Sequence, residues 1–155
     1  MNETKKYELT SETLQYAGHT LHRIKALKDF GSVKAGELGG WVEKEENLSQ
    51  YGNAWVSDDA WVSDDARVSG DARVCGDARV CGNADYIVFK NFWSSGRYFT
   101  WTRSNNKWCV GCFYGTGEEL IKKAYSDSEI SGREYERVVR YVEGILADEK
   151  KETSN

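Results

Sequence analysis

The cysteines and histidines are the residues of this sequence best suited to bind a metal ion or to act as a nucleophile or base. Cys109 and Cys112 form a Cys-x-x-Cys pair, while His19 and His22 lie far upstream. A structural zinc site needs a full ligand set, and no second Cys-x-x-Cys completes one. The pair also lies in a strand-like segment, not at a helix start, where thiol pKa values fall. We therefore expect buried cysteines, no cofactor and no bound metal, with a Cys109/Cys112/His19/His22 zinc site left open.

The other two cysteines, Cys75 and Cys81, are also expected to be reduced thiols. The N-terminus, MNETKKYELT, is too polar for a signal peptide. No apolar run approaches the roughly 18 residues needed to cross a bilayer. Disulfide bonds are uncommon in proteins that are not exported. The sequence thus predicts reduced cysteines, a location in the cytoplasm of the host cell and no membrane partner.

A six-residue repeat begins at residue 52 and reads GNAWVS, DDAWVS, DDARVS, GDARVC, GDARVC and a fading GNADYI. Alanine and valine alternate with an outward residue in each copy, which is the pattern of a strand with one buried face. The Gly, Asn and Asp residues between copies favour turns and tolerate positive φ. A corner in every hexad is too frequent for hairpins, so the repeat predicts a coil of short parallel strands.

The GxAxVx hexads resemble the left-handed β-helix of hexapeptide-repeat proteins. That resemblance implies that three hexads make one triangular turn of the coil, with about three coils in all. The same phase extends upstream, where Leu48 and Val42 fall on the alanine register and Leu38 on the valine register. More widely, the segments LHRIKALKDFGSVKAGELGGWVEKEENLS, GNAWV, DARV and GCFYGTGEELIKK resemble a group of small phage and prophage proteins with such repeats and a C-terminal α+β cap.

The residue between alanine and valine points outward in this interpretation. With three hexads to a coil, Trp55 would lie beneath Arg73 and Trp61 beneath Arg79, giving two cation–π pairs. Arg67 would lie beneath Asp85 as an ion pair. Two interpretations stay open: these side chains stiffen the outer faces, or they form an interface, since Trp and Arg dominate binding energy when desolvated. The predicted partner-binding residues are Trp55, Trp61, Arg67, Arg73 and Arg79, together with Trp93 and Trp101 from the aromatic segment that follows.

The overall prediction is a mainly β fold in which a short hexapeptide-repeat β-helix is followed by a small α+β cap. Residues 1–86 would hold N-terminal strands and the β-helix. Residues 87–148 would form the cap, a three-stranded β-meander with two C-terminal helices, the second capped by Ser131 and Glu134. Residues 149–155 would be a disordered tail. The cap would cover the open edge of the coil.

Charge and motif content argue against several functions. Lys and Arg number 21 against 25 Asp and Glu, and acids flank the repeat arginines, so nucleic acid is disfavoured as a partner. Acyltransferases with hexapeptide repeats use a histidine base, but both histidines precede the hexads. No phosphate-binding glycine motif occurs. The sequence therefore predicts that the protein is not an enzyme.

The function predicted from these features is binding by protein–protein contact, with the protein a homo-oligomer. The phage resemblance implies an inhibitor of a bacterial antiviral defence system, of the anti-CRISPR type, whose partner is a host defence protein. Two alternatives stay open: a sponge for a signalling nucleotide or other small molecule, and a minor structural protein of the virion.

Overall fold

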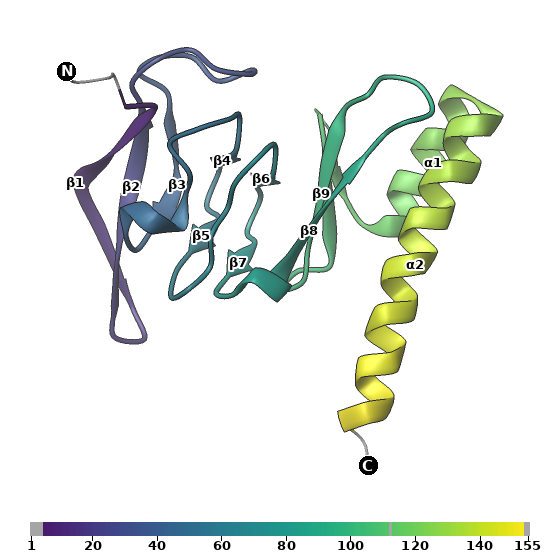
Figure 1. Ribbon diagram of the computed structural model, residues 1–155. Helices are drawn as coiled ribbons and strands as arrows, with labels where there is room; N and C mark the ends of the chain where they lie inside the picture. The colour runs from purple at the N-terminus through teal and green to yellow at the C-terminus, as the bar shows by residue number, and fades with distance from the viewer. Residues whose placement is uncertain (1–4, 112, 154–155) are drawn as a thin grey trace.

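The computed structural model describes residues 5–111 and 113–153, which consist mainly of β-strands followed by two α-helices (Figure 1). The strands form a five-stranded sheet, a four-stranded sheet and a two-stranded sheet. In Figure 1 the N-terminal strands, the repeat, the C-terminal sheet and the helices follow one another from left to right in chain order. The predicted mainly β fold is confirmed at this level.

The N-terminal strands extend the ladder of the repeat. β1 (Tyr7–Tyr16) and β2 (His19–Ala26) form an antiparallel hairpin whose turn residues, Ala17 and Gly18, both have positive φ. β2 pairs with β3 (Leu38–Val42), and β3 pairs in parallel with the repeat strand β5 (Trp61–Val62). With β7 (Arg79–Val80) as its last strand, the sheet has the order β1-β2-β3-β5-β7. The hairpin therefore stacks on the repeat as further strands of the same sheet.

Four short strands lie within the hexads: β4 (Trp55–Val56), β5 (Trp61–Val62), β6 (Arg73–Val74) and β7 (Arg79–Val80). Each pairs in parallel with the strand three hexads away, so that Trp55 lies opposite Arg73 and Trp61 opposite Arg79. Backbone hydrogen bonds follow the same spacing, as when the Trp55 N–H donates to the Ala72 carbonyl at 3.1 Å. This confirms the prediction that a hexad pairs with the hexad three copies farther along the chain.

The spacing upstream of the hexads is longer than three hexads. Val42 lies opposite Val62 and Leu48 opposite Val68, so two extra residues separate each pair. The predicted register, which placed Val42 and Leu48 on alanine positions, is therefore wrong, and Leu38 is exposed instead of inward. An even number of extra residues preserves the alternation of inward and outward side chains. Consequently Val42 and Leu48 are buried in spite of the shift.

The hexad alanines and valines form the core, as the repeat predicts. Corner residues Asp58, Asp64, Gly70 and Gly76 have positive φ, which turns the chain between rungs. Burying this many methyl groups stabilises the coil by about 0.8 kcal/mol for each CH₂ equivalent removed from water. The inward residues are all at most 1% exposed: Ala54, Val56, Ala60, Val62, Ala66, Val68, Ala72, Val74, Ala78 and Val80.

Two of the predicted partner-binding residues are buried, which corrects the expectation that they face solvent. Trp55 points away from the coil interior, but Tyr7 and Phe30 cover it at ring-centroid distances of 6.3 and 5.2 Å, leaving 1% exposed. Trp101 is fully buried beneath the C-terminal helices, and its indole N–H donates to Asn106 at 2.8 Å. A side chain at the outward position of a hexad is thus not necessarily exposed to solvent.

The C-terminal sheet has four antiparallel strands, one more than expected: β8 (Tyr86–Lys90), β9 (Tyr98–Thr102), β10 (Lys107–Val110) and β11 (Phe113–Gly115). They are ordered β11-β10-β9-β8, as in a meander. β8 contributes to two apolar clusters, since Tyr86 and Val88 pack against the repeat core whereas Ile87 and Phe89 pack against the helical one. Residue 86 therefore begins a strand that both cores share.

The backbone edge of the last coil receives side-chain acceptors from the residues that follow it. One coil earlier, the amides of Trp55 and Trp61 donate to the backbone carbonyls of Ala72 and Ala78 in the next coil. A free amide edge would invite pairing with another chain, so these bonds close off the ladder. The donor–acceptor pairs are Arg67 N–H to Asn83 (3.1 Å), Arg73 N–H to Thr100 (3.0 Å) and Arg79 N–H to Ser104 (2.8 Å).

Two α-helices, α1 (Gly117–Asp127) and α2 (Glu129–Thr153), cover the C-terminal sheet in the described part of the chain (Figure 1). α1 begins at a Thr116 cap whose hydroxyl accepts the Glu119 N–H. α2 begins before Ser131, because Ser128 accepts the Ser131 N–H at 3.0 Å. Its last turns include residues 149–153, which corrects the predicted disordered tail, while residues 154–155 lie outside the described residues. Neither helix is both long and apolar enough to cross a membrane.

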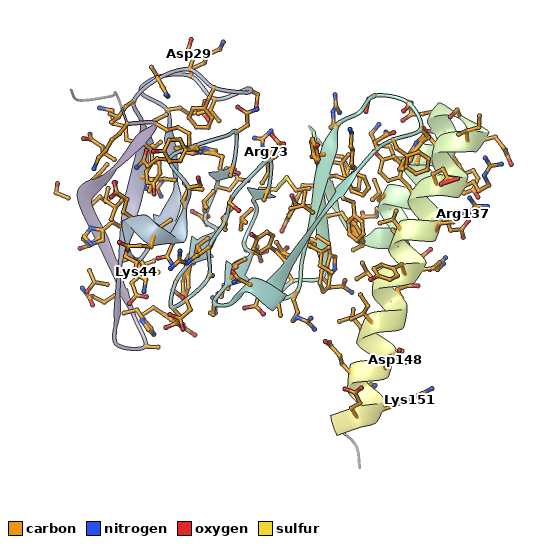
Figure 2. The ribbon with its side chains drawn as sticks, viewed as in Figure 1. Asp29, Lys44, Arg73, Arg137, Asp148 and Lys151 are labelled. Carbon is orange, nitrogen blue, oxygen red and sulfur yellow. A yellow bond between two sulfur atoms is a disulfide. The ribbon has the colours of Figure 1, made fainter. Side chains whose placement is uncertain are left out.

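Cys75 and Cys109 form a disulfide bond that joins the coil to the C-terminal sheet (Figure 2). This corrects the prediction that these two thiols are reduced. Sequence alone could not pair them, because their separation of 34 along the chain follows no motif. Cys81 is a free, exposed thiol, and Cys112 lies outside the described residues.

Candidate functional site

A cation–aromatic stack lies where the β1–β2 hairpin ends against the repeat. The Arg79 guanidinium carbon lies 4.3 Å from the centroid of the Trp61 ring and 5.2 Å from that of Tyr16. The two rings meet edge to face at 4.4 Å, and Arg79 also donates to the Tyr16 hydroxyl at 3.4 Å. The predicted Trp61–Arg79 pair is thus confirmed, and the structure adds Tyr16 to it.

A second pair continues this row along the sheet. Trp41 lies beside Trp61 across β3 and β5, and Arg23 lies 4.6 Å from the Trp41 ring. Glu12 forms an ion pair with Arg23 at 3.6 Å. Four neighbouring strands therefore carry the cross-strand sequence Arg, Trp, Trp, Arg on one face. Cross-strand stacking of this kind restrains side-chain rotamers and makes the face rigid.

Beside the stack, a histidine lies between two carboxylates. His19 Nδ1 lies 2.7 Å from Glu43 Oε2, and its Nε2 lies 3.5 Å from Asp64 Oδ1. Glu43 also accepts the Asp64 N–H at 2.8 Å, which fixes the carboxylates relative to each other. The hydrogen bond that His19 donates to Glu43 and the charge of Asp64 raise the pKa of His19. The same hydrogen bond lowers the pKa of Glu43.

We call the connected residues Tyr16, His19, Glu43, Trp61, Asp64 and Arg79 the hairpin-end patch. Tyr16 and His19 are cross-strand partners next to the β1–β2 turn, Glu43 directly follows β3, and Asp64 is the corner after β5. The hairpin thus brings two segments of the N-terminal sheet against three of the hexads. The patch combines aromatic surface, a cation and a histidine–carboxylate cluster.

The cluster has the ligand types of a metal site. One donor atom each from His19, Glu43 and Asp64 lies within 4.8 Å of the others. Imidazole with carboxylates suits Zn²⁺ or Mn²⁺ chemically. The zinc set left open by the sequence is different and is not assembled among the described residues, because Cys109 is disulfide-bonded and His19 binds Glu43. A histidine held by a carboxylate is also the arrangement of a general base.

The remaining predicted partner-binding residues lie outside the hairpin-end patch, on different parts of the molecule. Arg67 is exposed beside a small cavity formed with Lys44 and Asp65, and the predicted ion pair with Asp85 is replaced by one between Asp85 and Arg103 at 3.9 Å. Arg73 donates to Ser32 at 3.2 Å on another face. Trp93 lies in the C-terminal part, where its indole donates to Ser131 at 3.2 Å. Of the predicted partner-binding residues, only Trp61 and Arg79 belong to the patch.

Sequence reasoning missed Tyr16, Glu43 and the role of His19. No local motif marks them, since each lies outside the hexads. The available signal was the hairpin itself: a polar strand pair preceding the coil must stack on it, which brings its turn over the first rungs. To predict which side chains meet there, one must know that paired residues upstream of the hexads are two residues farther apart than three hexads. The hexad period does not give this longer spacing.

Comparison with known proteins supports the repeat. A family described as the YdcK beta solenoid repeat matches residues 60–76 and 66–82. The chain is thus similar, within its hexads, to β-solenoid repeat proteins. A stretch of 38 residues is 47% identical to the "Uncharacterized acetyltransferase YdcK" of Escherichia coli (strain K12), and covers 24% of this chain and 12% of that relative. The match therefore concerns a small part of either protein.

This relative contradicts one functional expectation. The sequence predicted that the protein is not an enzyme, because neither histidine lies in a hexad. A relative that shares the repeat is named as an acetyltransferase, which points toward an enzyme. The absence of a histidine from the hexads is also a poor criterion here, since the hairpin carries His19 against the hexad residue Asp64.

Proposed function

We propose that the chain binds a partner protein through the hairpin-end patch. The observation that carries this proposal is the placement of the Arg79 guanidinium against the Trp61 and Tyr16 rings. Trp, Tyr and Arg are the residue types that dominate binding energy at protein interfaces. The stack holds them in one geometry, so that little side-chain entropy is lost on binding.

The balance of charge in the patch fits a protein partner better than a polyanion. Glu43 and Asp64 offset the charges of Arg79 and of a protonated His19, so a phosphate backbone would meet as much repulsion as attraction. A protein surface can match both signs at once and can cover the exposed Tyr16 ring, which is 48% accessible.

For the partner, we propose a component of bacterial antiviral defence encountered in the host cytoplasm. The resemblance of the N-terminal and repeat segments to small phage proteins supports this choice. The scaffold would be a β-solenoid of about three coils, with the C-terminal sheet and helices as its cap. Self-association into a homo-oligomer belongs to the same proposal, supported by exposed apolar side chains on α1 and α2, among them Tyr125, Ile130 and Tyr141.

The test is capture of the partner from lysate of a defended bacterial host. Wild-type protein should retain a defence protein and should rescue phage growth in those cells. Trp61→Ala and Arg79→Ala should each reduce retention at least about tenfold, as expected for hot-spot residues. Arg67→Ala is the matched control, because Arg67 holds the same hexad position but is outside the patch. No retained defence protein together with no rescue would refute the proposal.

A second candidate function is acetyl transfer with His19 as the base. The name of the relative favours it, as does the 2.7 Å contact that orients the His19 ring through Glu43. With acetyl-CoA and a panel of amine and hydroxyl acceptors, wild type should release free thiol and His19→Ala should not. His22→Ala serves as the matched control. Thiol release unchanged in His19→Ala would exclude His19 as the base.

A further inference from the structure

A cleft of about 560 Å³ lies between the repeat and the C-terminal sheet, away from the hairpin-end patch. Its walls come from three separate segments: the tight turn at Gly31 and Ser32, Arg73 of β6, and Arg97, Tyr98 and Gly111 around β9 and β10. Figure 2 shows Arg73 at this place, between the repeat and the C-terminal strands. The volume of the cleft lies within the range of roughly 300–1,000 Å³ that is usual for small-molecule sites.

Two arginines face this cleft without a neutralising acid. Among the described residues, neither Arg73 nor Arg97 forms an ion pair, which is also true of Arg67 and Arg79, whereas Arg103 pairs with Glu149 and Arg140 with Glu118. Asp71 lines a smaller adjoining pocket of about 150 Å³, where its carboxylate accepts from Asn53 at 3.4 Å. In a chain whose net charge is −4, two unpaired guanidinium groups in one cleft form a local anion-attracting site.

The Arg73 guanidinium is held in place, whereas Arg97 is exposed and packs over a glycine. The Arg73 backbone is anchored by its N–H bond to Thr100, and its side chain donates to the Ser32 hydroxyl. Arg97 lies directly over Gly111, where any Cβ would collide with the guanidinium and where φ is +56°. A glycine is thus required at that position for Arg97 to occupy the cleft wall. A guanidinium group that is fixed, as that of Arg73 is, loses less entropy when it binds a phosphate.

An aromatic ring completes the site. Tyr98 lines the same cleft and is 41% exposed. Lys90 lies 5.8 Å from the centroid of its ring, which places a third cation near the cleft. Exposed aromatic rings beside arginines stack nucleobases while the cations bind the phosphates.

We propose that this cleft binds a phosphate-bearing nucleotide, with Arg73 and Arg97 on the phosphates and Tyr98 stacked on the base. The proposal does not depend on the partner-binding function, because it uses neither Trp61 nor Arg79. Two sources share the chemistry, a free nucleotide and the nucleotide portion of coenzyme A. Pyrophosphate reports the arginine contribution alone, since it has no base.

The test is isothermal titration calorimetry of the full chain with pyrophosphate, ADP and coenzyme A at low ionic strength. We expect ADP or coenzyme A to bind more tightly than pyrophosphate. Arg73→Ala and Arg97→Ala should each weaken binding of all three at least tenfold. Tyr98→Ala should weaken ADP or coenzyme A and leave pyrophosphate within twofold.

Arg67→Ala is the control for non-specific attraction, because it removes the same charge from the same hexad position outside the cleft. It should leave every affinity within twofold. Thermal unfolding of each variant without ligand establishes that the fold is retained. Absence of binding by wild type to all three probes, or equal loss in Arg67→Ala and Arg73→Ala, would overturn the site. Equal affinity for ADP in wild type and Tyr98→Ala would overturn the stacking role.

Discussion

Trp41 lies beside Trp61 across the parallel strands β3 and β5, although the chain between them is longer than the three hexads that separate paired residues within the repeat. The extra length lies between Leu48, which pairs with Val68, and Trp55, which pairs with Arg73. Farther upstream, the backbone of Gly39 and Gly40 packs directly on the coil. A Cβ on Gly40 would lie 2.5 Å from the Ala60 carbonyl oxygen. The entry of the chain into the coil thus depends on the absence of side chains at this point.

Replacement of Gly40 by alanine should therefore destabilise the fold. Because the obstructing atom is backbone, β3 must move away from β5, and we expect a loss of about 1–3 kcal/mol in the free energy of unfolding, as for other overpacked cores. Urea denaturation measures this loss. Gly82→Ala is the matched control, since no atom lies within 4 Å of its Cβ position and its φ is not positive. Equal stability of the two variants would contradict the packing at Gly40.

The two repeat tryptophans should respond differently to truncation. Trp55 is fully enclosed by Tyr7, Phe30 and the coil, so Trp55→Ala should cost about 3–5 kcal/mol. Trp61 is half-buried, and Trp61→Ala should cost about 1–2 kcal/mol through lost burial and the lost cation–π contact. Denaturation of both variants by urea tests the order. A larger loss for Trp61→Ala would mean that Trp61, not Trp55, is the core residue.

Val68→Asp should unfold the repeat. Val68 is fully buried and forms the parallel bridge to Leu48. A carboxylate at this point would be charged without a partner, which costs several kcal/mol and exceeds what a small domain can lose. Circular dichroism and the dispersion of amide NMR signals report the loss. Arg67→Ala, at the exposed neighbouring position, should remain folded, and a folded Val68→Asp protein would show that the coil interior admits water.

The His19–Glu43 contact should make stability depend on pH in a defined window. The pKa of His19 is raised above 6.5 in the folded state, so its contribution is complete below pH 6.5 and is lost as pH rises through the folded value. The pKa of Glu43 is lowered below 4.5, so its contribution is present above pH 4.5 and is lost as pH falls through the folded value. The His19–Glu43 contact therefore contributes most to stability at pH values between the folded-state pKa of Glu43 and that of His19.

An NMR titration of the His19 ring measures the first limit directly. In Glu43→Gln the neutral amide no longer favours the imidazolium, so the midpoint of His19 should move down. His19→Gln should remove the decline in unfolding free energy above pH 6.5. A midpoint of His19 that is identical with and without the Glu43 carboxylate would contradict the contact.

Loss of the Cys75–Cys109 disulfide should destabilise the protein. The bond closes a chain segment with a sequence separation of 34, and constraint of the unfolded chain by such a loop is worth about 3–4 kcal/mol. Cys109→Ser should show this loss in urea, and wild type should show it only when a reducing agent is added. Cys81→Ser, which removes a free exposed thiol, is the control. Identical behaviour of oxidised and reduced wild type would argue against the bond.

The hexads made the interior of the coil predictable, because each rung repeats the same Ala and Val pair and the same corner residues. What covers the coil was not predictable in this way. The burial of Trp55 depends on Tyr7 and Phe30, which lie upstream of the hexads and in no repeat. The meeting of His19, Glu43 and Asp64 likewise depends on a register that differs from the repeat period. The hexad period predicts contacts between copies of the repeat. The His19, Glu43 and Asp64 cluster instead forms between segments that differ in sequence.

The C-terminal side of the coil shows the same limit. The sequence suggested that a sheet would follow residue 86, but not that Thr100 and Ser104 would accept the free amides of β6 and β7. Hydroxyl acceptors are common in strands and have no recognisable spacing. The cleft between Arg73 and Arg97 was equally hidden, since the two arginines belong to different parts of the fold.

The amides at the end of the repeat are occupied, and the opposite end is covered by the β1–β2 hairpin (Figure 1). Another strand therefore cannot extend the ladder at the repeat end. At the opposite end β1 is the edge strand of the five-stranded sheet, so strand addition would extend this sheet in one direction.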